Sequence, residues 1–255
     1  MKYENTDISM FFDTIRVNLE SESESKAKTL MDNYLELWKA SSKIIKESIY
    51  VIDFHKKCFR FVSDQGIFLC GHTSEEVLQL GYQFYRKVIH PEDLPLLAKI
   101  HQIIFHCFSR QDALIRDLDC VVFNFRMRCG KKYLMASHKA VPLIVNDSVR
   151  LAICTVSDSI LQTSGNLYAY CNKGKIRYVY SFEGKRWKLD TQITLTLREK
   201  DILKWAKRGK TVNEIADILC LANQTLRNQK VELFDKLGTK NMIQSIIFAE
   251  NHFLI

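Results

Sequence analysis

Apolar and polar positions repeat along this chain with two different periods. Helical spacing runs through residues 8–19 and again from 26 to about 48, and then gives way to the alternation of β-strands. Strands are predicted over 48–54, 58–63, 118–129, 131–145 and 149–159, with helices over 71–81 and in the stretch that begins at Tyr85. The order within residues 26–160 is therefore a helix, two strands, two helices and three strands.

The helix predicted after residue 26 carries an apolar stripe that suits either of two roles. The stripe steps by four, three, four and three residues through Leu30, Tyr34, Leu37, Ser41 and Ile44. This is the spacing of a coiled-coil seam, so it favours contact between two subunits. Because the run is short and Ser41 interrupts it, a helix that packs on its own domain is the alternative interpretation.

Local signals place the ends and faces of the next elements. Thr73 or Ser74 is expected to cap the helix over 71–81. Pro91 is expected near the first turn of the long helix that follows, where Glu92 and Asp93 suit the positive N-terminal end. Alternation in strand 118–129 puts Phe123, Phe125 and Met127 on one face and Asn124, Arg126 and Arg128 on the other. Turns are expected at Cys129-Gly130 and Asn146-Asp147.

Residues 166–190 form a basic and aromatic stretch that predicts a small three-stranded meander. Its turn signals are Asn172-Lys173-Gly174 and Glu183-Gly184, and its six basic and two acidic residues give a net charge of +4. Basic residues interleaved with aromatic ones suit contact with a nucleic-acid backbone. The alternative is a spacer that packs its aromatic face on a neighbouring domain.

The C-terminal stretch predicts four short helices with a tight turn between the second and third. Thr196 with Glu199, and Thr211 with Glu214, have the spacing of capping boxes, and Gly209 is placed to take a positive φ at a helix end. Leu221 falls in the tight turn, and a fourth helix follows from Asn241 with an apolar face of Ile243, Ile246, Ile247 and Ala249. On the third helix, helical spacing turns Leu226, Gln229, Leu233 and Leu237 inward and Gln224, Arg227, Asn228 and Val231 outward. This arrangement is a helix-turn-helix.

The polar face of that third helix carries the chemistry of DNA recognition. A helix fits the major groove, where Arg pairs with guanine and Asn or Gln with adenine. The free backbone amides around Thr211 and Thr225 suit phosphate oxygens.

Composition and charge agree with an anionic partner. The 255 residues carry a formal net charge of +8 and a pI near 9.0, although residues 1–25, with two basic and six acidic residues, carry −4. The start of the chain lacks the pattern of a signal peptide and no apolar run is long enough for a membrane span, so we expect a cytoplasmic protein with no membrane partner.

Cysteine and histidine spacing give no sign of metal or catalytic chemistry. None of the eight cysteines forms a C-x-x-C pair, so we expect reduced thiols that fill cores rather than zinc ligands. His101 and His106 are five residues apart and do not share a helical face well. We therefore expect no enzyme, no metal and no cofactor, with haem or flavin binding as the alternative that an absorption spectrum would test.

Residues 40–160 resemble the PAS family of sensor domains. The resemblance is carried by the order of elements and by the sequence VIHPEDLPLL, which is similar to the stretch that opens the long PAS helix. It implies an α+β domain with a five-stranded antiparallel sheet cupped by helices, which in this family often encloses a ligand. The large side chains of Phe59, Phe61, Phe123, Phe125 and Met127 favour the alternative of a filled cup that serves for interaction or dimerisation.

The C-terminal segment resembles the LuxR/GerE-type DNA-binding domain. The matching residues are Leu195, Thr196, Arg198, Glu199, Ile202, Leu203, Gly209, Lys210, Thr211, Glu214, Ile215, Ala216, Leu219, Thr225, Leu226, Asn228, Leu233, Lys236, Leu237, Gly238 and Asn241. The chain departs from the family at Ala222, Gln229 and Met242, where Ser, His and Arg are usual. Asn223 is placed to cap the third helix instead of Ala222, and a buried Gln229 needs a polar partner.

The two resemblances together imply a bacterial transcription regulator. Expected parts are an acidic segment (1–25), a PAS-like sensor (26–160), a β-meander linker (161–192) and an all-α four-helix reader (193–255). DNA contacts are expected from Lys210, Thr211, Gln224, Thr225, Arg227, Asn228, Lys230 and Val231. Expected partners are double-stranded DNA, a second copy of the chain, RNA polymerase and a small-molecule ligand. A sigma-factor-like promoter reader is the alternative, but the β-rich front half argues against it.

Overall fold

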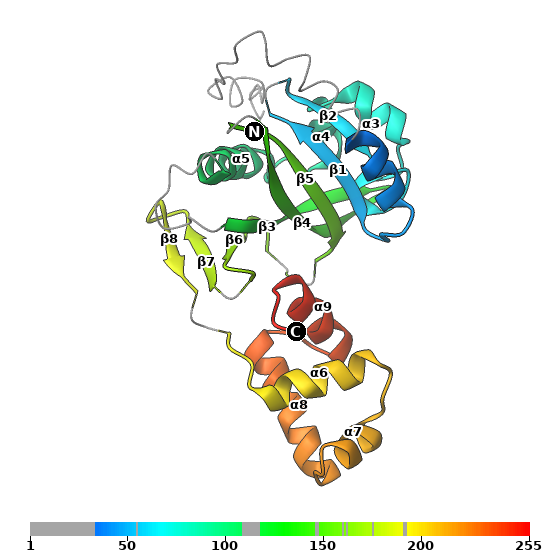
Figure 1. Ribbon diagram of the computed structural model, residues 1–255, viewed down its shortest axis with the longest axis vertical. Helices are drawn as coiled ribbons and strands as arrows, with labels where there is room; N and C mark the ends of the chain where they lie inside the picture. Colours follow the sequence, from blue (N-terminus) through cyan, green and yellow to red (C-terminus); the bar gives the residue numbers. More distant parts are fainter. Residues whose placement is uncertain are drawn as a thin grey trace. The chain divides into compact units, whose positions relative to one another are not determined.

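A computed structural model describes residues 34–54, 56–108, 118–145, 148–159, 161, 163–174, 176–190 and 193–255. The chain divides into two compact units, each considered by itself (Figure 1). One holds most of a β-sheet and its helices, and the other holds the C-terminal helices. The predictions for residues 1–25, Leu30 and the Asn146-Asp147 turn lie outside the described residues.

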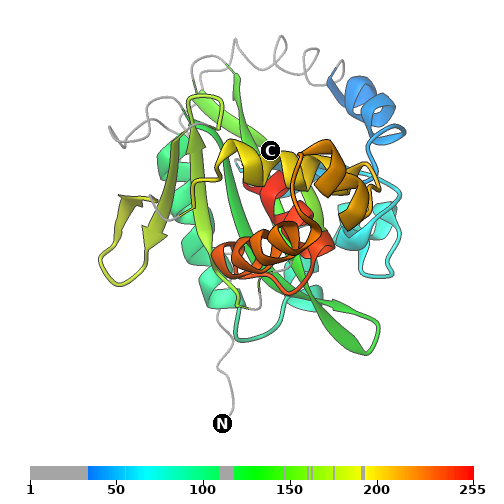
Figure 2. The ribbon, with the colours of Figure 1, turned by 90° about the horizontal axis from the view of Figure 1, so that it is seen from below.

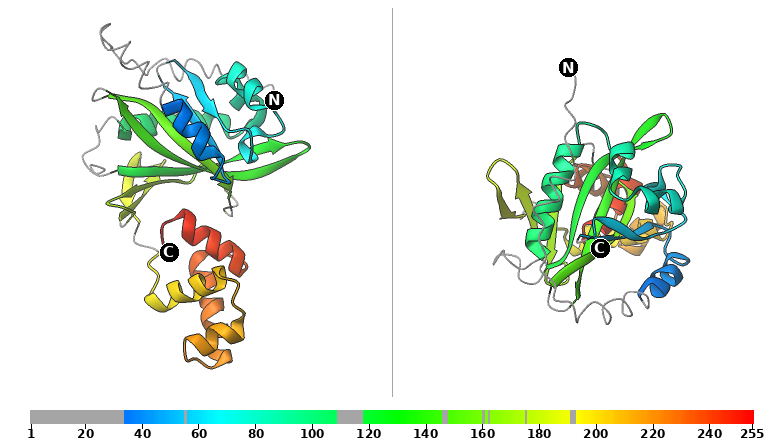
Figure 3. Two further views of the ribbon diagram at one scale, coloured as in Figure 1. Left: turned by 45° about the vertical axis from the view of Figure 1, so that its right-hand side comes forward. Right: turned by 90° about the horizontal axis from the view of Figure 1, so that it is seen from above.

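The sheet has eight strands in the order β2-β1-β5-β4-β3-β6-β7-β8 (Figures 1 and 3). The strands are β1 (Ser48–Asp53), β2 (Cys58–Val62), β3 (Leu118–Cys129), β4 (Lys132–Val145), β5 (Ser148–Asp158), β6 (Leu167–Cys171), β7 (Ile176–Ser181) and β8 (Arg186–Leu189). All five predicted strands and the three strands of the meander are present. The prediction of a separate five-stranded sheet is wrong, because the meander continues the same sheet.

Strand pairing explains why the meander joins the sheet. Strand β6 runs antiparallel to β3, with Val121 opposite Ala169 and Phe123 opposite Leu167. Leu167, Ala169 and Tyr170 are fully buried there. An edge at β3 would leave a row of backbone amides and carbonyls unpaired, and β6 satisfies them.

Three helices and one helical turn pack on the sheet: η1 (Ile67–Leu69), α3 (Ser74–Leu80), α4 (Gln83–Val88) and α5 (Leu94–Phe108). Thr73 caps α3 in a capping box with Glu76, as one of the two predicted caps. Pro91 lies in the turn directly before α5, near the first turn as predicted, whereas the separate short helix α4 was not predicted. Contacts of α4 and α5 with β3 place these helices beside the middle of the sheet.

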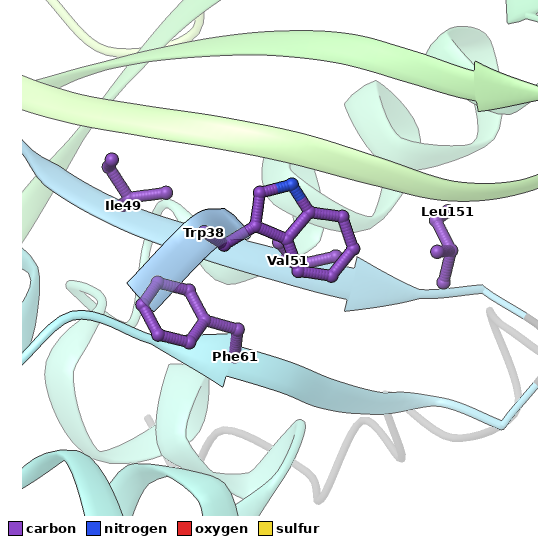
Figure 4. Close-up of a cluster of buried hydrophobic side chains, with 5 residues drawn as sticks. All are labelled: Trp38, Ile49, Val51, Phe61 and Leu151. Atoms are coloured by element: carbon purple, nitrogen blue, oxygen red, sulfur yellow. The ribbon is translucent and has the colours of Figure 1, made fainter. Parts of the chain in front are cut away.

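The helix at residues 34–42 packs on the other face of the sheet through Trp38. This indole lies among Ile49, Val51, Phe61 and Leu151, as Figure 4 shows. Side chains alternate along β1, so Tyr50 points to the opposite face, where its ring stacks on Phe68 at 4.2 Å between ring centroids. Phe61, predicted as part of the cup, therefore belongs to the Trp38 cluster instead.

Within this helix the apolar members of the predicted stripe face solvent, since Tyr34 is 37% and Leu37 58% exposed. The helix ends at residue 42, earlier than predicted, so Ile44, which is 83% exposed, lies in the turn that follows. The helix thus packs on its own domain through one face, as the alternative interpretation held, and leaves the stripe uncovered.

The polar face of β3 is partly covered by neighbouring segments. Asp93, at the start of α5, accepts hydrogen bonds from the Arg126 backbone amide (3.0 Å) and from its Nε (3.1 Å). Asn124 is 2% exposed because its side-chain amide donates to the Thr163 carbonyl (2.5 Å) and accepts from the Asn166 amide (3.0 Å). Asp93 therefore pairs with the Arg126 guanidinium. The sequence predicted only that Asp93 suits the positive end of the long helix, not this pairing.

The C-terminal unit consists of α6 (Leu197–Lys207), α7 (Val212–Ile218), α8 (Asn223–Leu237) and α9 (Met242–Asn251), yellow to red in Figure 2. Their buried core is formed by Ile202, Leu203, Ile215, Ala216, Leu226, Leu233, Leu237, Phe248 and Ala249. Ile243, predicted on the apolar face of the last helix, is 70% exposed. Among the described residues, no helix has the length and apolar character to cross a bilayer.

Candidate nucleic-acid interface

Both predicted capping boxes are confirmed, and each fixes the start of a helix of the C-terminal unit. The Thr196 hydroxyl accepts from the Glu199 amide (3.2 Å), and the Glu199 carboxylate accepts from the Thr196 amide (2.7 Å). Thr211 and Glu214 repeat this exchange at 3.3 and 2.8 Å. Gly209, just before the second box, has the predicted positive φ of 79°.

The turn between α7 and α8 depends on a residue that sequence reasoning missed. Cys220 takes a left-handed conformation with φ of 53°, and the Leu221 amide then donates to the Ala216 carbonyl at 2.8 Å. Ala222 occupies the N-cap of α8 without a side-chain hydrogen bond, and Asn223 is the first helical residue. The prediction that Asn223 caps this helix is therefore wrong, since its side chain lies inside the helix start.

Helix α8 divides into a buried and an exposed face. Leu226, Leu233 and Leu237 are buried, whereas the exposed side chains are Gln224, Thr225, Arg227, Asn228 and Val231. The Gln224 amide donates to the Asn228 side-chain oxygen at 3.1 Å, so these two polar groups share the first turns of the helix. The result is a contiguous polar surface that can donate to and accept from base edges.

Gln229 lies on the boundary between the two faces. Its side chain is half-buried, and its Oε1 atom has no hydrogen-bond partner among the described residues. The polar partner that a buried glutamine side chain needs is therefore absent among the described residues. A buried carbonyl oxygen without a partner costs free energy of folding.

Two of the predicted phosphate contacts are tied to a carboxylate. The Lys210 ammonium forms an ion pair with Glu214 (2.7 Å), and the Thr211 hydroxyl donates to the same carboxylate (2.9 Å). Hydrogen bonds from Lys210 and Thr211 lower the pKa of Glu214 to about 2, so the carboxylate stays charged. Lys230, by contrast, holds its ammonium over the Phe234 ring at 5.9 Å.

Long-range contacts hold α8 in place from α6. The Lys236 ammonium donates to both carboxylate oxygens of Glu199, at 2.9 and 2.8 Å. Burial raises the pKa of Glu199, but the hydrogen bonds from Lys236 and Thr196 outweigh it and hold the pKa below its usual value. Arg198 donates to the Leu219 carbonyl at 2.9 Å and so braces the end of α7. In the sequence these residues appear only as positions of a motif, and their spacing does not indicate which of them contact each other.

The structure separates the two histidines of α5. His101 is buried, with its ring 5.7 Å from that of Tyr85, whereas His106 is exposed. Within the described ranges, no group of three or more His, Cys, Asp or Glu side chains is arranged to hold a metal ion.

Comparison with known proteins finds a family model that matches the C-terminal unit. The family model for bacterial regulatory proteins of the luxR family matches residues 193–249. The Fimbriae Z protein of Salmonella typhimurium is 34% identical over 61 residues, which are 24% of this chain and 29% of that protein. The uncharacterized transcriptional regulatory protein YvfU of Bacillus subtilis is 38% identical over 80 residues, 31% of this chain and 39% of that protein. The chain thus spans less than half the length of these relatives.

A structural likeness extends over more of the chain but is weak. The solved structure of the Vibrio cholerae VqmA dimer, described with LuxR-type receptors, covers 86% of this chain and 88% of its own. The sequence identity is 14% and the TM-score is 0.35. A TM-score this low does not establish a shared fold.

Proposed function

From residues 193–249, which form a LuxR-family regulatory domain, we propose that this chain is a sequence-specific DNA-binding transcriptional regulator. The observation that carries the proposal is the exposed polar face of α8, held behind a tight turn and braced by Lys236 and Glu199. A helix presented in this way fits the major groove.

Each predicted contact residue has its own role in this proposal. Arg227, Asn228, Gln224 and Val231 meet the base edges, since they occupy the exposed face at the start of α8. Thr225 and Lys230 contact phosphates beside that face. Lys210 and Thr211 lie beside the phosphates with their side chains held by the Glu214 carboxylate, so they contribute less to phosphate binding than Lys230.

A gel-shift series tests the reading helix. An operator is first selected from a pool of genomic fragments by the purified full chain. Arg227→Ala is expected to lose about 1–3 kcal/mol of specific binding, because a bidentate arginine–guanine pair is removed. Arg86→Ala removes the same charge from the sheet unit and is the matched control. Wild-type affinity in the Arg227 variant would exclude the proposed role of that residue.

We further propose that the regulator works as a homodimer. One short helix reads only a few base pairs, so adequate specificity requires two half-sites. The exposed apolar side chains of Tyr34, Leu37 and Ile44, the first two on the helix and the third just after it, support a second copy as the partner. The first two predicted parts (1–25 and 26–160) would then supply dimerisation and sensing in the cytoplasm, and the last part (193–255) would supply DNA binding and a surface for RNA polymerase.

For the sheet unit we propose, more specifically, a PAS-like sensor that binds a small molecule. The Tyr50 hydroxyl lies 3.3 Å from His138 Nδ1 inside the apolar core, and the His138 ring stacks on Phe123 at 5.2 Å. His138 Nε2 is buried without a hydrogen-bond partner among the described residues. Burial lowers the pKa of His138 to about 3, so the ring is neutral and offers one acceptor or donor to a ligand. Native mass spectrometry of the purified chain would detect such a ligand.

A further inference from the structure

Two cysteines from distant parts of the sheet unit meet at its surface. Cys70 follows the helical turn η1, and Cys129 ends strand β3, 59 positions later. Their Sγ atoms are 3.6 Å apart, and both side chains are half-buried, unlike the fully buried thiols of Cys107, Cys120 and Cys154. This pair therefore differs from the core-filling thiols that the sequence predicts.

Both cysteines sit at bends that hold their backbones in place. Cys70 has a left-handed conformation with φ of 49°, and its amide donates to the Ile67 carbonyl at 3.2 Å. Cys129 is followed by Gly130, whose φ of 65° makes the tight turn into β4. A disulfide needs an S–S distance of about 2.05 Å, so the sulfurs must approach by only about 1.5 Å.

A basic pocket opens beside Cys70 and gives small molecules access to that thiol. The pocket has a volume of about 490 Å³ and is lined by Cys70, His72, Arg86, Lys87, Val88, Arg128 and Gly130. Three of these side chains are cationic and none is a carboxylate. Reactive cysteines occur in such electropositive, partly exposed surroundings, because positive charge favours the thiolate. A pocket of this kind admits a small oxidant to Cys70.

The two thiols are not equivalent. Burial, together with the neighbouring Cys129, raises the pKa of the Cys70 thiol well above its usual value. A pair in which one sulfur attacks and its neighbour resolves is the arrangement of redox-sensitive cysteines.

We propose that Cys70 and Cys129 form a peroxide-sensitive pair that closes to a disulfide. One of the two sulfurs, as its thiolate, attacks one oxygen of hydrogen peroxide, the O–O bond breaks, and the leaving hydroxide takes a proton to become water. The other thiol then attacks the sulfur of the resulting sulfenic acid, the S–S bond forms, and a second water leaves. The two thiols lose two electrons and the peroxide gains them. A cellular dithiol reverses the step by exchange.

Peptide mass spectrometry of the full-length chain tests the proposal. The reduced protein is treated with hydrogen peroxide, blocked with iodoacetamide and digested without reductant. A peptide pair joined through Cys70 and Cys129 is expected, and dithiothreitol should release it. Cys58→Ser removes another half-buried thiol and should leave the link in place. Oxidation of the exposed Cys220 while Cys70 and Cys129 both remain alkylated would overturn the proposal.

Single variants test whether the two sulfurs act as a pair. In Cys70→Ser and in Cys129→Ser the remaining thiol has no partner to resolve its sulfenic acid, so the joined peptide pair should disappear and dimedone should label the remaining cysteine after peroxide. Absence of the dimedone label from both variants would contradict the proposal. Circular dichroism before treatment shows whether each variant is folded, and disulfide closure in the wild type should raise Tm by several degrees because it restricts the unfolded chain.

Discussion

Gln229 is the residue at which the helix-turn-helix core is least complete. Its position on α8 lies between the buried Leu226 and Leu233, yet its Oε1 atom finds no hydrogen-bond partner among the described residues. The cost of burying such an oxygen is on the order of 1–3 kcal/mol. The unpaired oxygen therefore lowers the free energy of unfolding, and it does so at a side chain that does not face the DNA.

Replacing Gln229 by methionine should stabilise the C-terminal unit. Methionine has nearly the same shape and no oxygen to satisfy, so we expect about 1 kcal/mol more free energy of unfolding in urea. Operator affinity in the gel-shift assay should not change. Gln224→Met, at an exposed site on the same helix, is the matched control and should give no gain. A loss of stability in the Gln229 variant would show that the oxygen has a partner in solution.

Asp93 shows how one side chain joins a helix start to a strand. It is 3% exposed and receives hydrogen bonds from Arg126 and, at 2.6 Å, from the Ser164 hydroxyl. Burial raises the pKa of Asp93, but the hydrogen bonds from Arg126 and Ser164 outweigh it and leave the pKa below its usual value. A carboxyl with a lowered folded pKa stabilises the fold above its unfolded pKa, and that stabilisation disappears as pH falls through the folded value.

Asp93→Asn should therefore destabilise the sheet unit in a pH-dependent way. We expect a loss of about 2–3 kcal/mol at pH 7, since a charged, buried hydrogen-bond acceptor is removed. The difference from wild type should shrink below a pH of about 4, where the unfolded carboxyl is protonated. Glu92→Gln removes the exposed partner of the same Arg126 and should cost less than about 1 kcal/mol. Urea unfolding at several pH values measures both variants.

At the scale of elements, the sequence predicted correctly those features that depend on neighbouring residues, such as strand bounds and helix caps. The alternation over 118–129 has the same bounds as β3, and both Thr–Glu capping boxes form as predicted. Partners far along the chain left no local trace. The pairing of β6 with β3, the bridge from Lys236 to Glu199 and the meeting of Cys70 with Cys129 depend on the tertiary fold. Cys220 was missed because a left-handed turn position is normally signalled by glycine.

The helix at residues 34–42 carries the element-scale prediction. Trp38 anchors it on the sheet, so a change on its exposed side should leave the fold intact. Leu37→Glu places a charge in the proposed seam, and sedimentation equilibrium should show the dimer shifted to monomer. Lys46→Glu also introduces a glutamate outside the stripe, with a larger change of charge, and should leave the association unchanged. Equal masses for wild type and Leu37→Glu would place the dimer contact elsewhere.

At the scale of the whole molecule, the net charge of +8 should make DNA binding dependent on salt. Each phosphate contact releases condensed counterions, so the logarithm of the affinity falls linearly with the logarithm of salt concentration. Base contacts contribute little to this slope. Salt titration therefore separates the two kinds of residue proposed on and around α8.

Lys230→Ala should weaken binding to all sequences alike and reduce the magnitude of the salt slope by about one for each bound protomer. Arg227→Ala should mainly reduce the preference for the operator over random DNA. Lys210→Ala should lower the slope less than Lys230→Ala, because the Glu214 carboxylate already neutralises the Lys210 ammonium at 2.7 Å. Fluorescence anisotropy from about 50 to 200 mM salt, on operator and random duplexes, measures all three. A slope change for Lys210→Ala as large as that for Lys230→Ala would mean that Lys210 leaves Glu214 for a phosphate when DNA binds.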